Sequence, residues 1–415
     1  NNYLIYFMKI DTNPERIEDF LTRGVSALYP SKEFIKDLML SGKQLSMYIG
    51  VDPTGPTLHI GHMISLMKLS EFQKMGHKVI FLIGSFTGMI GDPTGRNSIR
   101  KQLTREEVLK NCEKYKEQAS IFLNFEGDNP VELRYNSEWH DKLTFRDVIN
   151  IASHFTVSQM LERDMFQERI KNNQPIGLHE FLYPLMQGYD SVVLGVDGEI
   201  GGNDQIFNML CGTTLMKDLK NREKFVVAMK LLIDPSGKKM GKSEGNMISL
   251  MSSSKDMFGK VMSWPDGMIY PGFELCTQVS SKDLSIIEDK IKSNENPRDL
   301  KLQLAYEIVK IYFGEEIAKQ EMDNFISQFS NKDLPNNMED VEIDKRFKNA
   351  TELISTAFNI SKTSARKMIE QGAVKIYYNG EMKKIIEPNK NVEINNDMVL
   401  QLGKLKYKRI KVKNV

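Results

Sequence analysis

Residues 48–62 read YIGVDPTGPTLHIGH, and this stretch decides the fold. It begins inside an apolar run at residues 44–51 that predicts a strand, and its prolines and glycine then predict a loop. Residues 58–75 carry apolar side chains at helical spacing up to Gly76, and residues 78–83 (KVIFLI) are typical of a buried parallel strand. Strand, loop, helix and strand form a βαβ unit. This unit predicts a Rossmann-like α/β domain with a parallel sheet and ligands at the carboxyl ends of its strands.

The rest of the chain divides by its composition into further predicted parts. Charged helical patterns at about residues 104–171 predict a helical insertion in the α/β domain, which we place at residues 1–245. Residues 246–335 predict a helical domain that ends in a polar linker. Residues 345–415 predict a small basic α+β module.

Charge is unevenly distributed along the chain. Of 415 residues, 40% are hydrophobic and 27% charged, an ordinary composition for a folded protein with a sizeable core, and the net charge is +1. Residues 345–415 contain 16 lysines and arginines against 6 aspartates and glutamates, a net charge of +10, which leaves −9 on the remainder. A basic module on an acidic body indicates a polyanion-binding part, with a solvated basic face as the alternative.

The cysteines and the chain start indicate a cytoplasmic protein. Cys112, Cys211 and Cys276 form no C-x-x-C pair, which fits a reducing compartment and argues against a disulfide framework or a zinc site. No apolar run reaches the roughly 18 residues of a membrane span. Residues 1–7 lack the features of a signal peptide, and we expect Met8 to be the natural start.

Two histidines at a helix start form the first candidate site. His59 and His62 are three residues apart and therefore share a helix face. Free backbone N–H groups and the helix dipole at this end attract phosphate. Gly61 removes a side chain between them, so that a base or ribose can approach the backbone. Two surface histidines, or a metal pair that needs a third ligand, are the alternatives.

A lysine-rich loop forms the second candidate site. Residues 238–243 read KKMGKS and suit negative charge that develops on phosphates. A P-loop is excluded, because only three residues separate Gly237 from Gly241 where the P-loop pattern needs four. A charged surface loop is the alternative.

Taken together, the two sites resemble the HIGH and KMSKS motifs of class I aminoacyl-tRNA synthetases. Four further motifs narrow the resemblance to bacterial-type tyrosyl-tRNA synthetases and extend it over nearly the whole chain. They are GDPTGR at residues 91–96, NSEW at 136–139, YPLMQGYD at 183–190 and GGNDQ at 201–205. The resemblance implies a catalytic α/β domain at residues 1–245, a helical domain that faces the tRNA anticodon, ATP and L-tyrosine as substrates, and tRNA(Tyr) as partner.

The resemblance also implies a role for each matching residue. Six match groups that bind the substrate tyrosine: Tyr48 and Asp190 at its phenol, Asp92, Tyr183 and Gln187 at its ammonium group, and Gln205 near its carboxylate. The expected ATP-binding residues are Gly50, Asp52, Thr54, His59, Gly61, His62, Gly202, Asp204, Lys239 and Lys242. The expected catalytic residues are His59, His62, Lys239, Lys242 and Ser243.

The implied chemistry is consistent with these residue types. A buried carboxylate such as Asp190 needs a hydrogen-bond donor, and a phenol hydroxyl supplies one. Asp92 offers a charge-assisted partner to an ammonium group. Adenylation is an in-line attack of an ionised carboxylate on the α-phosphorus of ATP, so positioning and charge stabilisation replace a general base. We expect Mg²⁺ to accompany ATP, without a protein metal site.

Two positions depart from the pattern of the family. Ile49 stands where many relatives have a small polar residue that touches the ribose, which predicts that this contact is absent. Gly241 replaces the central serine of KMSKS, a change that relatives tolerate.

The basic tail resembles an S4 RNA-binding module. Residues 350–372 predict two helices, followed by a strand that begins at Ala373. Lys362, Arg366 and Lys367 are the expected RNA-binding residues, and they would contact phosphates rather than bases. A basic capping domain without RNA is the alternative. The resemblance also implies a homodimer, formed through the helical insertion.

Three other functions compete with this interpretation. A tryptophanyl-tRNA synthetase shares the fold and both main motifs, but it generally lacks an S4-like tail, and the Tyr48–Asp190 pair favours a phenol. A nucleotidylyltransferase would need neither the Y-x-x-x-Q-x-x-D motif nor an RNA module. A non-catalytic RNA-binding relative would be expected to have lost parts of the HIGH or KMSKS motif.

Overall fold

The protein is represented by a computed structural model. It describes residues 9–94, 102–237, 239–240, 247–330, 338–344, 349–378, 381–403 and 406–413. The chain forms two compact units, Asn1–Met322 and Asp323–Val415. No helix in the described ranges is long and apolar enough to cross a membrane.

A six-stranded sheet in the order β1-β6-β5-β2-β3-β4 forms the centre of the first unit. Its strands are β1 (Val25–Tyr29), β2 (Ser46–Val51), β3 (Lys78–Ile83), β4 (Glu132–Tyr135), β5 (Gly198–Gly202) and β6 (Phe225–Met229). The pairing is parallel except between β1 and β6. Because successive strands move away from β2 in one direction and from β5 in the other, the strand order reverses between them. In open α/β sheets, this is where ligands bind.

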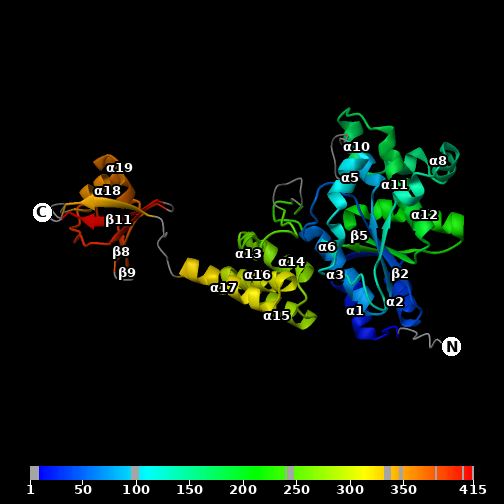
Figure 1. Ribbon diagram of the computed structural model, residues 1–415, viewed down its shortest axis with the longest axis horizontal. Helices are drawn as coiled ribbons and strands as arrows, with labels where there is room; N and C mark the ends of the chain where they lie inside the picture. Colours follow the sequence, from blue (N-terminus) through cyan, green and yellow to red (C-terminus); the bar gives the residue numbers. More distant parts are fainter. Residues whose placement is uncertain are drawn as a thin grey trace. The chain divides into compact units, whose positions relative to one another are not determined.

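Helices cover the sheet, and some of them are largely buried. Figure 1 draws α10 and α11 above strands β2 and β5, and α1 and α2 below them. The helices up to the sheet's last strand are α1 (Pro14–Thr22), α2 (Lys32–Leu40), α3 (Ile60–Lys74), α4 (Thr87–Ile90), α5 (Arg105–Cys112), α6 (Tyr115–Ala119), α7 (Ser137–His140), α8 (Phe145–Ala152), α9 (Val157–Leu161), α10 (Asp164–Lys171), α11 (Leu178–Leu194) and α12 (Ile206–Lys220). Glycines allow α11 and α12 to pack closely, since a Cβ at Gly188 would lie 3.0 Å from the backbone carbon of Cys211.

After the last strand of the sheet, the chain continues as a series of helices in the same compact unit. Its remaining helices are α13 (Ser254–Met262), α14 (Ile269–Cys276), α15 (Ser281–Lys292), α16 (Pro297–Phe313) and α17 (Glu315–Ser330), the last of which extends past Met322. The Arg23 guanidinium donates to backbone oxygens of Glu274 and Thr277 at 3.2 and 2.8 Å. The helical part expected from residue 246 is therefore packed against the α/β part.

The predicted α/β class and its βαβ unit are confirmed: β2, α3 and β3 form in the expected order. The insertion expected at residues 104–171 is interrupted by β4, which pairs with β3 and belongs to the sheet. Two short strands, β1 and β4, were not predicted. Both lie at the edges of the sheet, where the alternation of apolar and polar residues is weak.

Besides the end of α17, the described part of the second unit contains a five-stranded sheet in the order β7-β11-β10-β8-β9 and two helices. Its elements are β7 (Glu339–Ile343), α18 (Ala350–Phe358), α19 (Lys362–Glu370), β8 (Val374–Tyr378), β9 (Glu381–Ile385), β10 (Val399–Leu402) and β11 (Lys406–Val412). The two helices expected at residues 350–372 are present. Because β7 pairs with β11, the module begins before the expected boundary at residue 345.

Candidate active site

A cavity of about 420 Å³ lies at the point where the strand order of the main sheet reverses. It is lined by most of the residues that the sequence singled out: Gly50, Asp52, Thr54, His59, Gly61, His62, Asp92, Tyr183, Gln187, Asp190, Gly202, Asp204, Gln205 and Lys239. Ile49 also lines it, and its side chain has no polar atom. Tyr48 is not in the lining, and Lys242 and Ser243 lie outside the described residues.

The two histidines cap the start of helix α3, and both line the cavity. His59 Nδ1 accepts from the backbone N–H of Gly61 at 3.1 Å, and His62 Nδ1 accepts from the backbone N–H of His59 at 3.2 Å. Burial, together with His59 and Lys239, lowers the pKa of His62 well below its usual range. A neutral His62 whose Nδ1 accepts must carry its proton on Nε2, which is therefore a donor.

The expected free N–H groups at the start of α3 are absent. The backbone N–H of Ile60 donates to Ile248 O at 2.9 Å, and that of His62 donates to His59 O at 2.8 Å. Gly61 also has a different role from the expected one: a Cβ there would lie 2.9 Å from His59 Cε1, so glycine makes room for the imidazole. At this helix start, the Nε2–H of His62, rather than the backbone, is therefore the donor that we expect a phosphate to meet.

Asp52, at the end of β2, is fixed by two donors. Tyr183 Oη donates to Asp52 Oδ2 at 2.8 Å, and Thr87 Oγ1 donates to Asp52 Oδ1 at 2.7 Å. Burial and the Asp52 charge raise the pKa of Tyr183 well above its usual range, so its hydroxyl keeps the proton that it donates. A Cβ at Gly84 would lie 2.0 Å from Asp52 Oδ1, and only glycine therefore fits at this position.

Asp190 is buried and already has several donors, contrary to the expectation that the phenol would supply one. Its Oδ1 accepts from Trp139 Nε1 at 2.8 Å and contacts His140 Nε2 at 2.7 Å, while its Oδ2 accepts from Asn136 Nδ2 at 3.3 Å. Burial raises the pKa of the Asp190 carboxyl, although these three neighbours favour the ionised form. Asp190 Oδ2 has one long contact, and it is the oxygen with room for a further donor.

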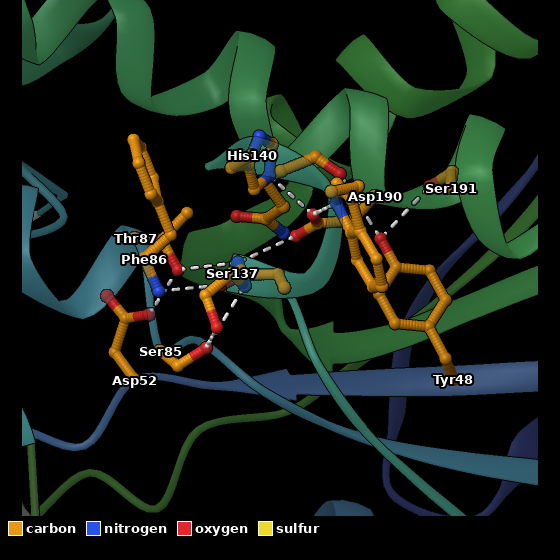
Figure 2. Close-up of polar contacts among 12 residues, drawn as sticks. Tyr48, Asp52, Ser85, Phe86, Thr87, Ser137, His140, Asp190 and Ser191 are labelled. Atoms are coloured by element: carbon orange, nitrogen blue, oxygen red, sulfur yellow. Dashed lines mark hydrogen bonds and ion pairs between the residues drawn. The ribbon is translucent and has the colours of Figure 1, made fainter. Parts of the chain in front are cut away.

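Tyr48 lies behind the cavity wall, next to Asp190. Its side chain is fully buried, and its hydroxyl lies 3.0 Å from Ser191 Oγ and 3.4 Å from the backbone oxygen of Gln187. Figure 2 shows Asp52 and Thr87 on one side of Asp190, and Tyr48 and Ser191 on the other. Contact between Tyr48 and a phenol therefore stays a prediction.

Asp92 and Gln205, expected at the ammonium group and near the carboxylate of the substrate tyrosine, contact each other directly. Gln205 Nε2 donates to Asp92 Oδ2 at 2.7 Å, and Gln205 Oε1 accepts from Asn208 Nδ2 at 3.1 Å. Thr94 Oγ1 donates to Asp92 Oδ1 at 2.7 Å. These bonds fix the orientation of the Gln205 amide and of the carboxylate.

Lys239 extends from the loop of the second motif to Asp204. Its ammonium group lies 2.6 Å from Asp204 Oδ2, and both side chains retain exposure to solvent. Two residues with expected roles at ATP thus form an ion pair, which a phosphate can exchange for a contact with Lys239.

The expected RNA-binding residues of the second unit lie together on α19. Lys362, Arg366 and Lys367 are exposed. Two of them form surface ion pairs, Lys362 with Glu352 at 3.2 Å and Arg366 with Glu370 at 3.1 Å. Such pairs are weak and open readily for a phosphate.

Several residues that line the cavity or contact its lining carry no role in the sequence interpretation. Asn136 and Trp139 lie in a quoted motif, but their contact with Asp190 was not inferred. His140, Glu199 and Lys224 were missed altogether. A signal for the last two exists: Glu199 lies within β5 and Lys224 directly precedes the apolar strand β6, and these two strands pair in the sheet.

Comparison with known proteins gives the family. Residues 40–330 match the family described as tRNA synthetases class I (W and Y). The tyrosine–tRNA ligase of Thermotoga maritima is 42% identical over 399 residues, which span 96% of this chain and 98% of that protein. The tyrosine–tRNA ligase of Moorella thermoacetica is 40% identical over 416 residues, which span 99% of each.

A solved structure has the same fold. A C-terminally truncated mitochondrial tyrosyl-tRNA synthetase of Aspergillus nidulans matches with a TM-score of 0.64 at 23% identity, over 76% of this chain and 94% of that one. The chain belongs to the class I tRNA synthetases of the tryptophan and tyrosine family and, within it, to the tyrosine–tRNA ligases.

Proposed function

We propose that the chain activates L-tyrosine with ATP, which yields tyrosyl-adenylate and pyrophosphate, and then transfers tyrosine to the 3′-terminal adenosine of tRNA(Tyr). The observation that carries this proposal is the composition of the cavity. Carboxylate and amide groups such as Asp92, Asp190 and Gln187 line it together with His59, His62 and Lys239. The first group suits an amino acid with a phenol and an ammonium group, and the second suits phosphates.

The proposed first step needs positioning and charge stabilisation. The tyrosine carboxylate attacks the α-phosphorus of ATP, a bond to pyrophosphate breaks, and no proton has to be removed from the nucleophile. His62 donates from Nε2, and Lys239 leaves Asp204 to meet the negative charge that develops on the phosphates. In the second step, a ribose hydroxyl of the tRNA attacks the adenylate carbonyl and releases AMP.

Amino-acid-dependent exchange of labelled pyrophosphate into ATP tests the activity. We expect exchange with tyrosine and only background exchange with tryptophan or without an amino acid. Exchange with tryptophan would support a tryptophanyl enzyme, exchange without an amino acid a nucleotidylyltransferase, and no exchange at all a non-catalytic RNA-binding protein.

We propose that Mg²⁺ enters with ATP. Among the described residues, no three His, Cys, Asp or Glu side chains are arranged to hold a metal ion. The phosphate oxygens and water would therefore supply most of its ligands, as is common for Mg²⁺ at nucleotides. The Mg²⁺ ion would neutralise phosphate charge beside Lys239. Chelation by EDTA should abolish exchange, and added Mg²⁺ should restore it.

We also propose a homodimer, formed through helices α8 and α9 and the start of α11. Large apolar side chains project there, with Phe145 80%, Val157 71% and Leu178 78% exposed. An apolar cavity of about 210 Å³ adjoins them and includes Val148 and Leu182 in its lining. Exposed apolar patches of this kind mark interaction surfaces.

Light scattering tests the dimer at micromolar protein concentration. The wild type should have twice the mass of one chain, and the combination of Phe145→Asp and Leu178→Asp should yield a monomer. A monomeric wild type would contradict the proposal.

For the second unit, we propose that the exposed basic side chains of α19 contact the tRNA backbone, as in an S4 module. We also propose that the protein acts in the cytoplasm.

A further inference from the structure

A buried ion pair adjoins the cavity beneath Gln187. Lys224, immediately before β6, pairs with Glu199 of β5, and their side chains are 0% and 2% exposed. Lys224 Nζ also donates to Ser191 Oγ and to the backbone oxygen of Met209, at 3.0 Å each. An ammonium group has three N–H donors, so every donor of Lys224 has an acceptor.

Glu199 connects this ion pair to the cavity. It belongs to the lining, and its Oε1 accepts from Gln187 Nε2 at 2.9 Å. An ionised carboxylate can only accept hydrogen bonds. Gln187 must therefore turn its amide nitrogen to Glu199, which leaves its oxygen for another donor.

The charges of Glu199 and Lys224 depend on each other. Burial lowers the pKa of Lys224, and the adjacent Glu199 carboxylate opposes this shift. A buried charge without its partner is costly, so the ammonium group and the carboxylate stabilise each other.

We propose that Glu199, held ionised by Lys224, is a positioning residue that fixes the Gln187 amide with its oxygen toward the substrate ammonium group. An ammonium group only donates, so it is attracted by an amide oxygen and repelled by an amide nitrogen. The inference rests on the proposed function and adds to it: the buried ion pair selects a ligand with an α-ammonium group.

The variant Glu199→Gln removes the constraint, because an amide at position 199 can both donate and accept. It also leaves the Lys224 charge without a counterion, which threatens folding. The double variant Glu199→Gln/Lys224→Met removes both charges and leaves the orientation of Gln187 equally free. It serves as the test protein if the single variant does not fold.

The readout is the binding of two ligands to the full chain, L-tyrosine and its des-amino analogue hydroxyphenylpropionate, by calorimetry. Glu199→Gln should weaken tyrosine binding by roughly tenfold or more, the effect of one hydrogen bond to a charged group, and change binding of the analogue by less than about twofold. Gln187→Met should have the same selective effect in the wild type. It should add little in the Glu199→Gln background, because both changes remove one contact.

Arg169 and Glu180 provide a matched control, an ion pair whose side chains are likewise 0% and 2% exposed. Glu180→Gln should reduce stability but keep the ratio of the two ligand affinities. Equal weakening of both ligands by Glu199→Gln, or unchanged tyrosine affinity, would overturn the positioning role. A wild type that binds no tyrosine would instead overturn the proposed function, so the two failures are distinguishable.

Discussion

Asp52 and Asp190 show how single carboxylates organise the cavity. Each accepts hydrogen bonds from side chains of other elements, and Asn136 links the two by donating to Thr87 Oγ1 at 3.0 Å and to Asp190. Because a carboxylate cannot donate, the proton positions on its neighbours are fixed before a ligand arrives. Because these side chains are already oriented, fewer of them have to reorient when a ligand binds.

The phenol contact is testable at Asp190 and Tyr48. Asp190→Asn replaces an acceptor by an amide and should reduce the preference for tyrosine over phenylalanine by roughly 1.5–3 kcal/mol, the range for a hydrogen bond to a charged group. Tyr48→Phe should reduce it by no more than roughly 0.5–1.5 kcal/mol, because its hydroxyl is engaged with Ser191. Pyrophosphate exchange with both amino acids gives the ratio. An unchanged ratio in both folded variants would show that other groups read the phenol.

Lys239 should act on the rate rather than on tyrosine affinity. Lys239→Ala should slow adenylate formation roughly 10- to 100-fold, because one charged contact to the transition state is lost. We expect the same for Lys242→Ala. Single-turnover kinetics and tyrosine titration separate the two quantities, and Lys310→Ala, outside the cavity, is the control. Loss of tyrosine affinity with an unchanged rate would contradict this role.

His77 should make stability depend on pH. It is fully buried, and burial lowers its pKa to about 4 from an ordinary value of 6.5. The unfolded chain therefore takes up a proton at a higher pH than the folded chain. Stability from this residue is complete above about pH 6.5 and falls by roughly 3 kcal/mol as pH drops toward 4. Urea unfolding of wild type and His77→Gln across this range tests it, and parallel curves would contradict the prediction.

The sequence predicted which residues would line the cavity better than it predicted their contacts. Motif matches singled out Asp190 and Gln187, and both line the cavity, while their contacts with a substrate stay predictions. The donors of Asp190 and the Glu199–Lys224 pair were missed, because these contacts join residues that are distant in sequence. Burial alone made Asp190 need a donor, but the protein, rather than only a substrate, supplies it.

Among the elements, the α11–α12 pair determines much of the site. Helix α11 carries Tyr183, Gln187 and Asp190, and α12 begins directly after Gln205. The two helices pack through glycines, and a Cβ at Gly212 would lie 2.5 Å from Lys224 Nζ and 2.6 Å from Ser191 Oγ. Because Gly212 has no side chain, there is room beside it for the buried ammonium group of Lys224.

Gly212→Ala should displace Lys224 and destabilise the fold by roughly 1–3 kcal/mol, as overpacking in a core usually does. Tyrosine binding should weaken as well, through Gln187. Gly259→Ala in α13 is a matched control, because a Cβ there meets nothing within 4 Å. Chemical denaturation measures both variants, and equal stabilities would show that the core at Gly212 can relax.

A buried strand could be predicted from the sequence more accurately than half-exposed strands, because burial imposes a clear apolar pattern. Strand β3 was predicted at its observed bounds, since five of its six residues are buried and apolar. Strands β1 and β4 are half-exposed at the sheet edges and carry no clear pattern. Helix α11 contains Pro184, a residue that usually argues against a helix interior.

At the scale of the whole molecule, charge and structure divide the chain in a similar way. The +10 module at residues 345–415 belongs to the second unit, whereas the described active-site residues belong to the first. A polyanion such as tRNA is attracted to the basic module by its phosphates, and this attraction is sensitive to salt. We therefore expect that tyrosine activation needs no group of the second unit.

Removal of residues 338–415 should leave tyrosine activation within about twofold of the wild type and reduce tRNA charging by tenfold or more at physiological salt. The cut lies before β7 rather than at residue 345, because β7 without β11 would leave an unpaired strand. Pyrophosphate exchange measures activation, and acylation of tRNA(Tyr) measures charging.

A triple variant of the full chain tests the same prediction with a smaller change than the truncation: Lys362→Ala/Arg366→Ala/Lys367→Ala. It keeps the module folded and should remove phosphate contacts, so the slope of tRNA affinity against salt should become shallower. If the folded truncation lost activation and charging equally, the two units would not divide the work. If the truncated protein charged tRNA as well as the wild type, the second unit would have no part in tRNA binding. Its basic surface would then be only a solvated face.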